Sequence, residues 1–402
     1  MTHIRFLSSD TPPHTFTLIL TSAIAALSMN LFLPSLPAMA AYFEAPYGVV
    51  QLSVALYLVI TAIFQLFIGP LSDRHGRRKV MLWSIVIFAI ASLGATLSTH
   101  IIPFLIFRMC QGAIVTGMVL SRAIVRDLYD TEKAASMVGY VTMGQAVAPM
   151  FAPAIGGQLQ AHFGWQANFA ALTFLGIFLF WLVRQDLGET KPAGAGQGRS
   201  FDNIATLFKS QRFWGYVLAS GLSAGAFFTY LGSAPFIGSE LYGLSPERLG
   251  AYFGAPAIGY FLGNFISGLY AARIGINRMV MTGSTVVTLG CGASLLLFKL
   301  GYGSVESFFA FVTCVGLGNG LSIPSATSGA LSVRPDLAGT ASGLGGSIMI
   351  FIGAALSSLA GALLSHETGP FPALWLMFLC GVGSVIATSF VLWRAHEIKR
   401  GA

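Results

Sequence analysis

Long apolar stretches restrict this chain more than any other feature of its sequence. An α-helix needs about 20 predominantly apolar residues to cross the hydrocarbon core of a bilayer. Only 9% of the residues are charged, far below the roughly 25% of typical soluble domains. We therefore expect an all-α membrane protein with twelve transmembrane helices, over residues 16–37, 48–70, 79–99, 101–125, 134–158, 165–184, 213–235, 248–272, 279–299, 304–327, 338–364 and 371–394.

The basic residues lie mainly on one side of this predicted topology. Of the 22 Lys and Arg residues, Arg248 and Lys299 would lie outside and Arg108 within a span. All others would lie on the same side as the two termini, and Lys and Arg accumulate on the cytoplasmic side of membrane proteins. We therefore expect a multi-pass protein with both termini in the cytoplasm. Topology explains the net charge of +7, so we expect no nucleic-acid partner.

A polar linker divides the predicted spans into two sets of six. We expect an N-terminal six-helix bundle over 1–184, a cytoplasmic linker over 185–211 and a C-terminal six-helix bundle over 212–402. After Ser200, a candidate N-cap, apolar residues recur at the spacing i, i+3, i+4, i+7, which predicts a short helix in the membrane interface. An irregular linker is the alternative. The apolar residues concerned are Phe201, Ile204, Ala205 and Phe208.

A short basic turn joins the second and third predicted spans, and it is partly repeated in the second half. The turn reads Gly69-Pro-Leu-Ser-Asp-Arg-His-Gly-Arg-Arg-Lys79. A constant shift along the chain places Gly69, Arg74 and Gly76 on Gly268, Arg273 and Gly275, and Asp73 on Ala272. Two bundles related by an axis along the membrane normal would produce such a repeat, with a substrate cavity between them. We therefore expect the two bundles to be pseudo-symmetric.

Three motifs resemble signatures of major facilitator superfamily transporters. The basic turn is similar to the G-x-L-x-D-R-x-G-R-R/K loop of that superfamily, and Arg108-Met-Cys-Gln111-Gly112 is similar to its R-x-x-Q-G motif in span 4. The A-P-x-x-G-G sequence at 152–157 resembles the antiporter motif of span 5. In that motif prolines bend the helix and glycines allow close helix packing. The corresponding residues here are Pro149, Pro153, Gly156 and Gly157.

Three further stretches resemble the Bcr/CflA-type drug-resistance subfamily. They are residues 30–37 in span 1, 121–127 at the end of span 4 and 338–342 at the start of span 11. The resemblance implies the twelve-helix fold of the superfamily in a bacterial inner membrane. It implies export of small amphipathic drugs or metabolites by alternating access, with the proton gradient as energy source.

The resemblance also implies a conformational gate at the basic turn. In related transporters, this loop closes the cytoplasmic side. Asp73 would approach the start of span 11 near Ala338, where the helix dipole favours an anion. Arg77 would approach the end of span 4 near Asp127. The gate residues expected from this resemblance are Gly69, Asp73, Arg74, Gly76, Arg77 and Asp127.

Polar and aromatic side chains within the spans are the candidates for substrate binding or coupling. An ionisable side chain in lipid is costly, so Arg108 is a functional candidate, although an arginine at this depth can also snorkel to the interface. Intramembrane amides are often interhelical hydrogen-bonding groups, and aromatic residues often face lipid or the helix core. The candidates are Asn30, Arg108, Gln111, Gln145, Phe228, Tyr230, Asn264 and Asn319.

Asn30 departs from the subfamily pattern, which commonly has an acidic residue at this position. None of the 15 Asp and Glu residues lies at a predicted membrane midplane. A proton antiporter normally needs a titratable group in its pathway. Three explanations remain open: the coupling group lies nearer an interface, the protein is not proton-coupled, or Asn30 is an introduced substitution.

A selective transporter is the alternative function. If Arg108 has no protein partner, its donors favour an anionic metabolite or a siderophore-like compound, and such a transporter need not be proton-coupled. We expect no enzyme, because the chain has no nucleophile–base pair and no P-loop. We also expect no cofactor and no metal site, and a monomer whose partners are substrate, protons and the lipid bilayer.

Overall fold

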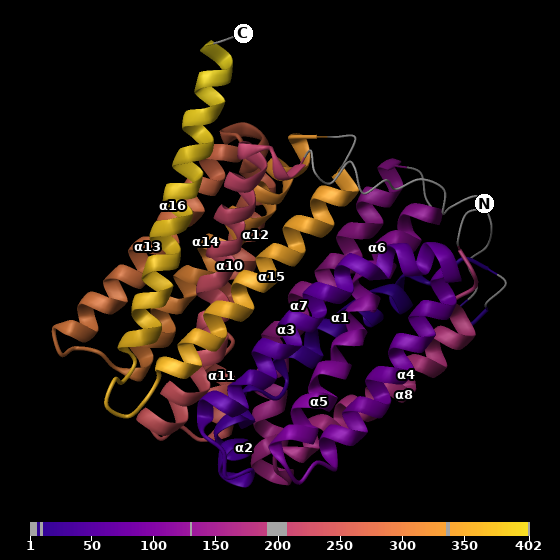
Figure 1. The fold of residues 1–402 in the computed structure, drawn as a ribbon, viewed down its shortest axis with the longest axis horizontal. Helices are drawn as coiled ribbons and strands as arrows, with labels where there is room; N and C mark the ends of the chain where they lie inside the picture. Colours follow the sequence, from indigo (N-terminus) through magenta and orange to yellow (C-terminus); the bar gives the residue numbers. More distant parts are fainter. Residues whose placement is uncertain (1–5, 9–10, 129–130, 191–206, 335–337, 401–402) are drawn as a thin grey trace. The chain divides into compact units, whose positions relative to one another are not determined.

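The computed structural model describes residues 6–8, 11–128, 131–190, 207–334 and 338–400, which form helices joined by short turns (Figure 1). The chain divides into two compact units, Met1–Gly198 and Arg199–Ala402, and the boundary falls within the predicted linker. Residues 201–206 of the predicted interfacial helix lie outside the described residues, so that helix stays a prediction. Among the described residues every regular element is helical.

Within its described residues the N-terminal unit contains eight α-helices and two short 3₁₀ turns. Within it α1 packs on α7 and α4 packs on α8. The elements are α1 (Thr15–Asn30), η1 (Leu33–Ser35), α2 (Leu36–Tyr42), α3 (Tyr47–His75), α4 (Arg77–Thr96), α5 (Ile101–Gln111), η2 (Gly112–Ile114), α6 (Val115–Leu128), α7 (Thr131–Phe163) and α8 (Gln166–Asp186).

The C-terminal unit is also a bundle of packed helices. Helices α12 and α13 pack on α14, while α10 packs on α15 and α16. The elements are α10 (Gln211–Phe236), the π-helical turn η3 (Ile237–Leu241), α11 (Pro246–Tyr252), α12 (Ala255–Ile274), α13 (Ile276–Lys299), α14 (Val305–Ser332), α15 (Ala338–Leu363) and α16 (Phe371–Arg400).

Ten helical stretches within the described residues are long and apolar enough to cross a membrane. Two of them run through the 3₁₀ turns: Thr15–Tyr42 includes η1, and Ile101–Val125 includes η2. Helices α7 and α12 occupy the two remaining predicted positions, 134–158 and 248–272. The structure therefore has a helix at each of the twelve predicted spans.

The predicted start of the helix over 248–272 is wrong. The structure has a separate short helix, α11, and then begins α12 at Ala255. Gly254 is the N-cap of α12 and Pro256 lies in its first turn. Proline has no amide hydrogen and is favoured in the first turn of a helix, so Pro256 favours a helix start at this point.

One glycine joins two consecutive helices at the same place in each unit. Gly76 ends α3 and precedes α4, with φ 96° and ψ 146°. Gly275 ends α12 and precedes α13, with φ 91° and ψ 146°. This backbone region is essentially restricted to glycine. The matching conformations give physical support to the sequence repeat at the basic turn.

We predict that Gly76→Ala lowers the thermal unfolding temperature of the detergent-solubilised protein more than Gly275→Ala does. Both changes place a side chain in a backbone region that costs about 1–3 kcal/mol. At Gly76 the new Cβ would also overlap the carboxylate of Glu189, whereas at Gly275 it would meet nothing within 4 Å.

The matched control is Gly69→Ala. Gly69 lies inside α3, and a Cβ there would meet nothing within 4 Å. Alanine is favoured over glycine in a helix by about 1 kcal/mol, so this change should not lower the unfolding temperature. Equal effects of Gly76→Ala and Gly69→Ala would contradict the conformational role of Gly76.

Candidate functional site

Arg108 is fully buried in the core of the N-terminal unit. Its guanidinium carbon lies 4.3 Å from the ring centroid of Phe32 and 4.0 Å from that of Tyr57, so two aromatic rings hold the cation. Nη1 donates to Oε1 of Gln111 at 2.7 Å, and Nη2 donates to the carbonyl oxygen of Ser28 at 3.2 Å. The snorkelling alternative is therefore excluded.

Hydrogen bonds extend from this cation to four helices. Arg108 and Gln111 lie three residues apart on α5 and so share one face of that helix. Gln111 Nε2 donates to Oγ of Ser92 on α4 at 2.7 Å. The Ser28 and Tyr57 hydroxyls, on α1 and α3, are 2.9 Å apart. The Arg108 cluster, as we call these residues with Phe32, thus ties α1, α3, α4 and α5 together.

No carboxylate lies within ion-pair distance of Arg108 among the described residues. Its Nε is buried and has no hydrogen-bond partner there. Desolvated cation–π contacts contribute about 2 kcal/mol or more, and hydrogen bonds to a charged group about 1.5–3 kcal/mol. Their sum is of the order of the cost of burying an arginine in a membrane helix, about 2.5–3.5 kcal/mol on insertion scales. Neutral partners can therefore hold this charge.

Sequence reasoning found Arg108 and Gln111 but missed the aromatic and hydroxyl partners. Ser28, Tyr57 and Ser92 come from three other helices and Phe32 from the turn between α1 and η1, and no spacing along the chain links them. An aromatic residue is too common in a membrane helix to identify a cation partner by itself.

Asn30 is buried at the last residue of α1, where its Nδ2 donates to the carbonyl oxygen of Ala26 at 2.9 Å. The side chain is thus tied to its own helix. Among the described contacts none joins Asn30 to Arg108. On α7, Gln145 is half-buried, and its Nε2 has no partner among the described residues.

The candidates of the C-terminal unit lie in or beside its helix contacts. Asn319 Oδ1 accepts from Oγ of Ser223 at 2.6 Å, which links α14 to α10. Asn264 Nδ2 donates to the carbonyl oxygen of Tyr260 in its own helix at 2.8 Å. Phe228 packs against α15 so closely that a Cβ at Gly353 would overlap its ring.

Tyr230 is fully buried among aromatic rings. Its ring centroid lies 5.4 Å from that of Phe253 and 6.1 Å from that of Phe309. Its hydroxyl has no partner among the described residues. Both Phe228 and Tyr230 therefore have a packing role in their own unit, and a role in substrate binding stays a prediction.

Arg77 lies between two carboxylates at one end of the N-terminal unit. Its guanidinium is 2.7 Å from Oδ1 of Asp73 and 3.0 Å from Oδ2 of Asp127, and it also contacts the hydroxyl of Ser72. The predicted approach of Arg77 to Asp127 is confirmed. The approach of Asp73 to Ala338 would join the two units and stays a prediction.

Glu189 is a second partner of this region that the sequence did not reveal. Its Oε1 accepts from the backbone amide of Arg77 at 2.8 Å, at the first residue of α4. A carboxylate is favoured at a helix N-terminus because the free amides and the helix dipole are positive there. Glu189 thus attaches the start of the linker to α4. Arg74 is exposed, and a Cβ at Gly69 would meet nothing within 4 Å.

At Gly156, the span 5 motif makes the close packing contact that its glycines predict. A Cβ at this position of α7 would overlap the carbonyl oxygen of Leu31, next to α1. Gly157 and Pro153 are buried. Both Pro149 and Pro153 lie inside α7, and the bending that they are expected to cause stays a prediction.

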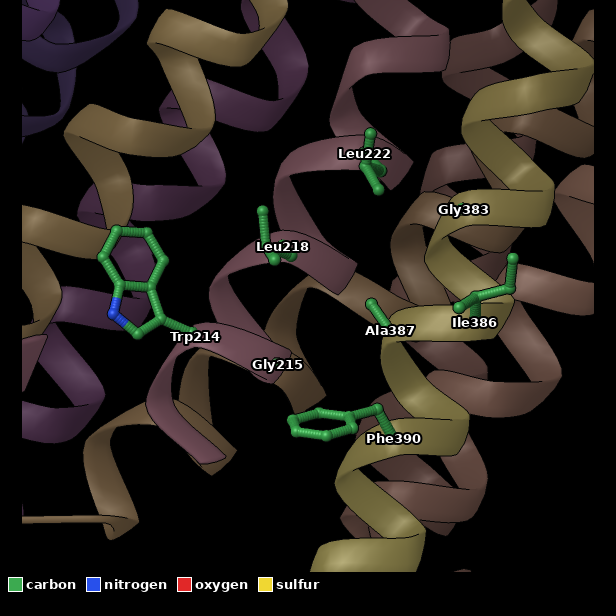
Figure 2. Close-up of a pocket in the computed structure, with 8 residues that line it drawn as sticks. All are labelled: Trp214, Gly215, Leu218, Leu222, Gly383, Ile386, Ala387 and Phe390. Atoms are coloured by element: carbon green, nitrogen blue, oxygen red, sulfur yellow. The ribbon is translucent and has the colours of Figure 1, made fainter. Parts of the chain in front are cut away.

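An apolar groove of about 340 Å³ lies between α10 and α16 of the C-terminal unit (Figure 2). Its lining includes Leu218, Ile386 and Phe390, and no charged residue contributes to it. Such a groove can hold only apolar groups. Among the described residues no cluster of His, Cys, Asp and Glu could hold a metal ion.

We predict that Arg108→Lys and Arg108→Gln both lower the unfolding temperature of the purified protein. Lysine keeps the charge but lacks the planar guanidinium that stacks on two rings and donates in two directions. Loss of one charged hydrogen bond of about 1.5–3 kcal/mol would shift the unfolding temperature by about 2–4 °C per kcal/mol. Arg248→Lys, at an exposed position, should leave it unchanged. An unchanged unfolding temperature in both Arg108 variants would show that the Arg108 cluster is not structural.

Solved transporters share this fold. A bacterial homologue of the human lysosomal transporter Spinster, inward-facing and occupied, has a TM-score of 0.74 at 17% identity, over 95% of this chain and 96% of that one. A D-xylose–proton symporter has a TM-score of 0.73 at 14% identity, over 94% and 96%. The predicted all-α membrane fold is therefore confirmed.

Relatives at higher identity cover almost the whole chain. An uncharacterized MFS-type transporter, YdgK, of Bacillus subtilis (strain 168) is 31% identical over 91% of this chain and 92% of its own. Multidrug resistance protein D of Escherichia coli (strain K12) is 30% identical over 91% and 92%. A bicyclomycin resistance protein homolog of Haemophilus influenzae is 27% identical over 94% and 97%.

The profile of the Major Facilitator Superfamily matches residues 18–358. The predicted resemblance to Bcr/CflA-type proteins is confirmed by the drug-resistance relatives. The chain is thus a transporter and not an enzyme, and it belongs to the major facilitator superfamily.

Proposed function

We propose that this transporter exports small amphipathic compounds, drugs or metabolites, by alternating access in exchange for protons. Relatives that cover most of the chain are named for multidrug, bicyclomycin and chloramphenicol resistance. The protein would act as a monomer in a bacterial inner membrane, with both termini in the cytoplasm.

The main observation in support of this proposal is that neutral groups surround Arg108. Two of its guanidinium nitrogens already donate to Gln111 and Ser28, and two rings cover the cation. A guanidinium held in this way is poorly placed to bind a carboxylate of the substrate in the bidentate geometry. An amphipathic compound without an anionic group is therefore favoured over the anionic metabolite or siderophore-like compound.

We place the cytoplasmic gate at Asp73, Arg77 and Asp127. One guanidinium shared by two carboxylates holds α3 to α6, and these contacts would break when the cytoplasmic side opens. With Asn at position 30, these two carboxylates are the first candidates for proton coupling.

The test of export is drug susceptibility in a bacterial strain that lacks its own major efflux pumps. Expression should raise resistance to several chemically unrelated amphipathic compounds. Asp73→Asn should lose this resistance while substrate binding to the purified protein persists, because the change shifts the conformational equilibrium and not the binding contacts. Glu367→Gln, at an exposed position, is the control. Loss of one anionic metabolite from the cells without drug resistance would favour the selective transporter.

The test of coupling is substrate flux in liposomes with and without an imposed pH gradient. We predict that the wild type and Asn30→Asp respond equally to the gradient, because the proposed coupling groups are Asp73 and Asp127 and not residue 30. Asp127→Asn should lose the response, and Glu367→Gln should keep it. A gradient response that appears only with Asn30→Asp would instead identify position 30 as the proton site.

A further inference from the structure

A second pocket lies beside the gate in the N-terminal unit. Its volume is about 360 Å³, and it lies where α3 ends, α4 begins and the chain leaves α8. Three permanent cations and one carboxylate line it, so positive charge is in excess. The lining residues are Arg74, His75, Gly76, Arg78, Lys79 and Glu189. We call this site the basic pocket.

The cations of the basic pocket are distinct from the gate. Arg77 is engaged by Asp73 and Asp127 and does not line the pocket. Arg74 and Lys79 are exposed, and among the described residues neither has an ion-pair or hydrogen-bond partner. Arg78 donates from Nη2 to the carbonyl oxygen of Arg184 at 2.8 Å, while its Nε is buried without a partner. The contacts of the gate therefore do not neutralise the charges of Arg74, Arg78 and Lys79.

One carboxylate of the protein already lies in the basic pocket. The carboxylate of Glu189 accepts from the amide of Arg77, at the N-terminus of α4. It supplies one negative charge against the three cations of the pocket lining, so positive charge remains in excess. A second anion beside Glu189 would therefore meet net positive charge.

The neighbouring surface is apolar and aromatic. Phe67 and Leu71 on α3 and Trp83 on α4 are all exposed, Phe67 by 62% and Trp83 by 52%. Trp83 also contacts the ring of His75, at 5.9 Å between centroids, so the apolar surface adjoins the pocket. Tryptophan is enriched at the headgroup level of membranes. The cations of the basic pocket therefore lie beside an exposed apolar surface.

We propose that the basic pocket binds the phosphate of an anionic phospholipid, with its acyl chains along the exposed apolar side chains of α3 and α4. Arg74, Arg78 and Lys79 supply the attraction, and Arg78 adds a free donor. Basic pockets at membrane helix ends suit phospholipid headgroups, and each Lys or Arg near such a surface contributes about 1 kcal/mol, or about five-fold in affinity.

The test is native mass spectrometry of the full-length protein in detergent, titrated with phosphatidylglycerol and, in parallel, phosphatidylcholine. The wild type should retain phosphatidylglycerol more tightly. The double variant Arg74→Gln/Lys79→Gln should weaken phosphatidylglycerol binding by about five-fold for each cation removed. Because binding is the readout, the result does not depend on the proposed export or coupling.

Two further variants make the test specific to the pocket. Arg273→Gln/Arg278→Gln removes the same charge from the equivalent turn of the C-terminal unit, where both arginines are exposed. It should leave phosphatidylglycerol binding unchanged. Glu189→Gln keeps an acceptor for the Arg77 amide but removes the negative charge, so it should strengthen binding. Unfolding temperatures check that each variant is folded.

Three outcomes would overturn the proposal. Equal losses from the two double variants would show a general attraction to basic turns, and equal retention of the two lipids by the wild type would show no headgroup selection. Glycerol phosphate that binds as tightly as phosphatidylglycerol would assign the pocket to a soluble phosphate compound. Much weaker binding of glycerol phosphate supports the lipid.

Discussion

The burial of the Arg108 guanidinium, with no carboxylate beside it among the described residues, is the constraint on which the N-terminal unit depends. A cation in a low-dielectric core has to be compensated locally, and here two aromatic rings and neutral oxygens provide the compensation. These groups come from different helices, so the charge fixes how α1, α3, α4 and α5 pack. Under the proposed export function, apolar and neutral groups would recognise the substrate.

The two arginine sites of the N-terminal unit differ in their partners: Arg77 is paired with carboxylates, whereas Arg108 is held by neutral groups. The Arg108 cluster contains no acid, whereas Asp73, Asp127 and Glu189 gather around the start of α4. The equivalent turn of the C-terminal unit has the same glycine conformation, but Ala272 replaces the aspartate. The repeat therefore preserves the backbone turn while the ion-pair network is built in one unit. Such asymmetry is expected if one turn carries a gate and the other only connects two helices.

The sequence predicted the helices well because about 20 apolar residues and a basic turn leave few alternatives. It failed at the start of α12, where Gly254 and Pro256 interrupt an apolar run that hydropathy alone reads as continuous. It identified Arg108 but not Phe32 or Tyr57, because contacts between distant spans leave no spacing along the chain. The sequence left open whether Arg108 snorkels and whether its donors are free, and the structure buries it with two nitrogens bound to Gln111 and Ser28.

Proton-coupled export requires outward transport of an amphipathic compound that depends on the pH gradient. The most direct measurement is real-time efflux of a fluorescent lipophilic dye from preloaded, energised cells, before and after the pH gradient is collapsed with an ionophore that leaves the membrane potential. We predict that the protein accelerates efflux and that the acceleration disappears when the gradient collapses. Efflux that continues unchanged after the collapse, or dye that moves inward, would contradict proton-coupled export.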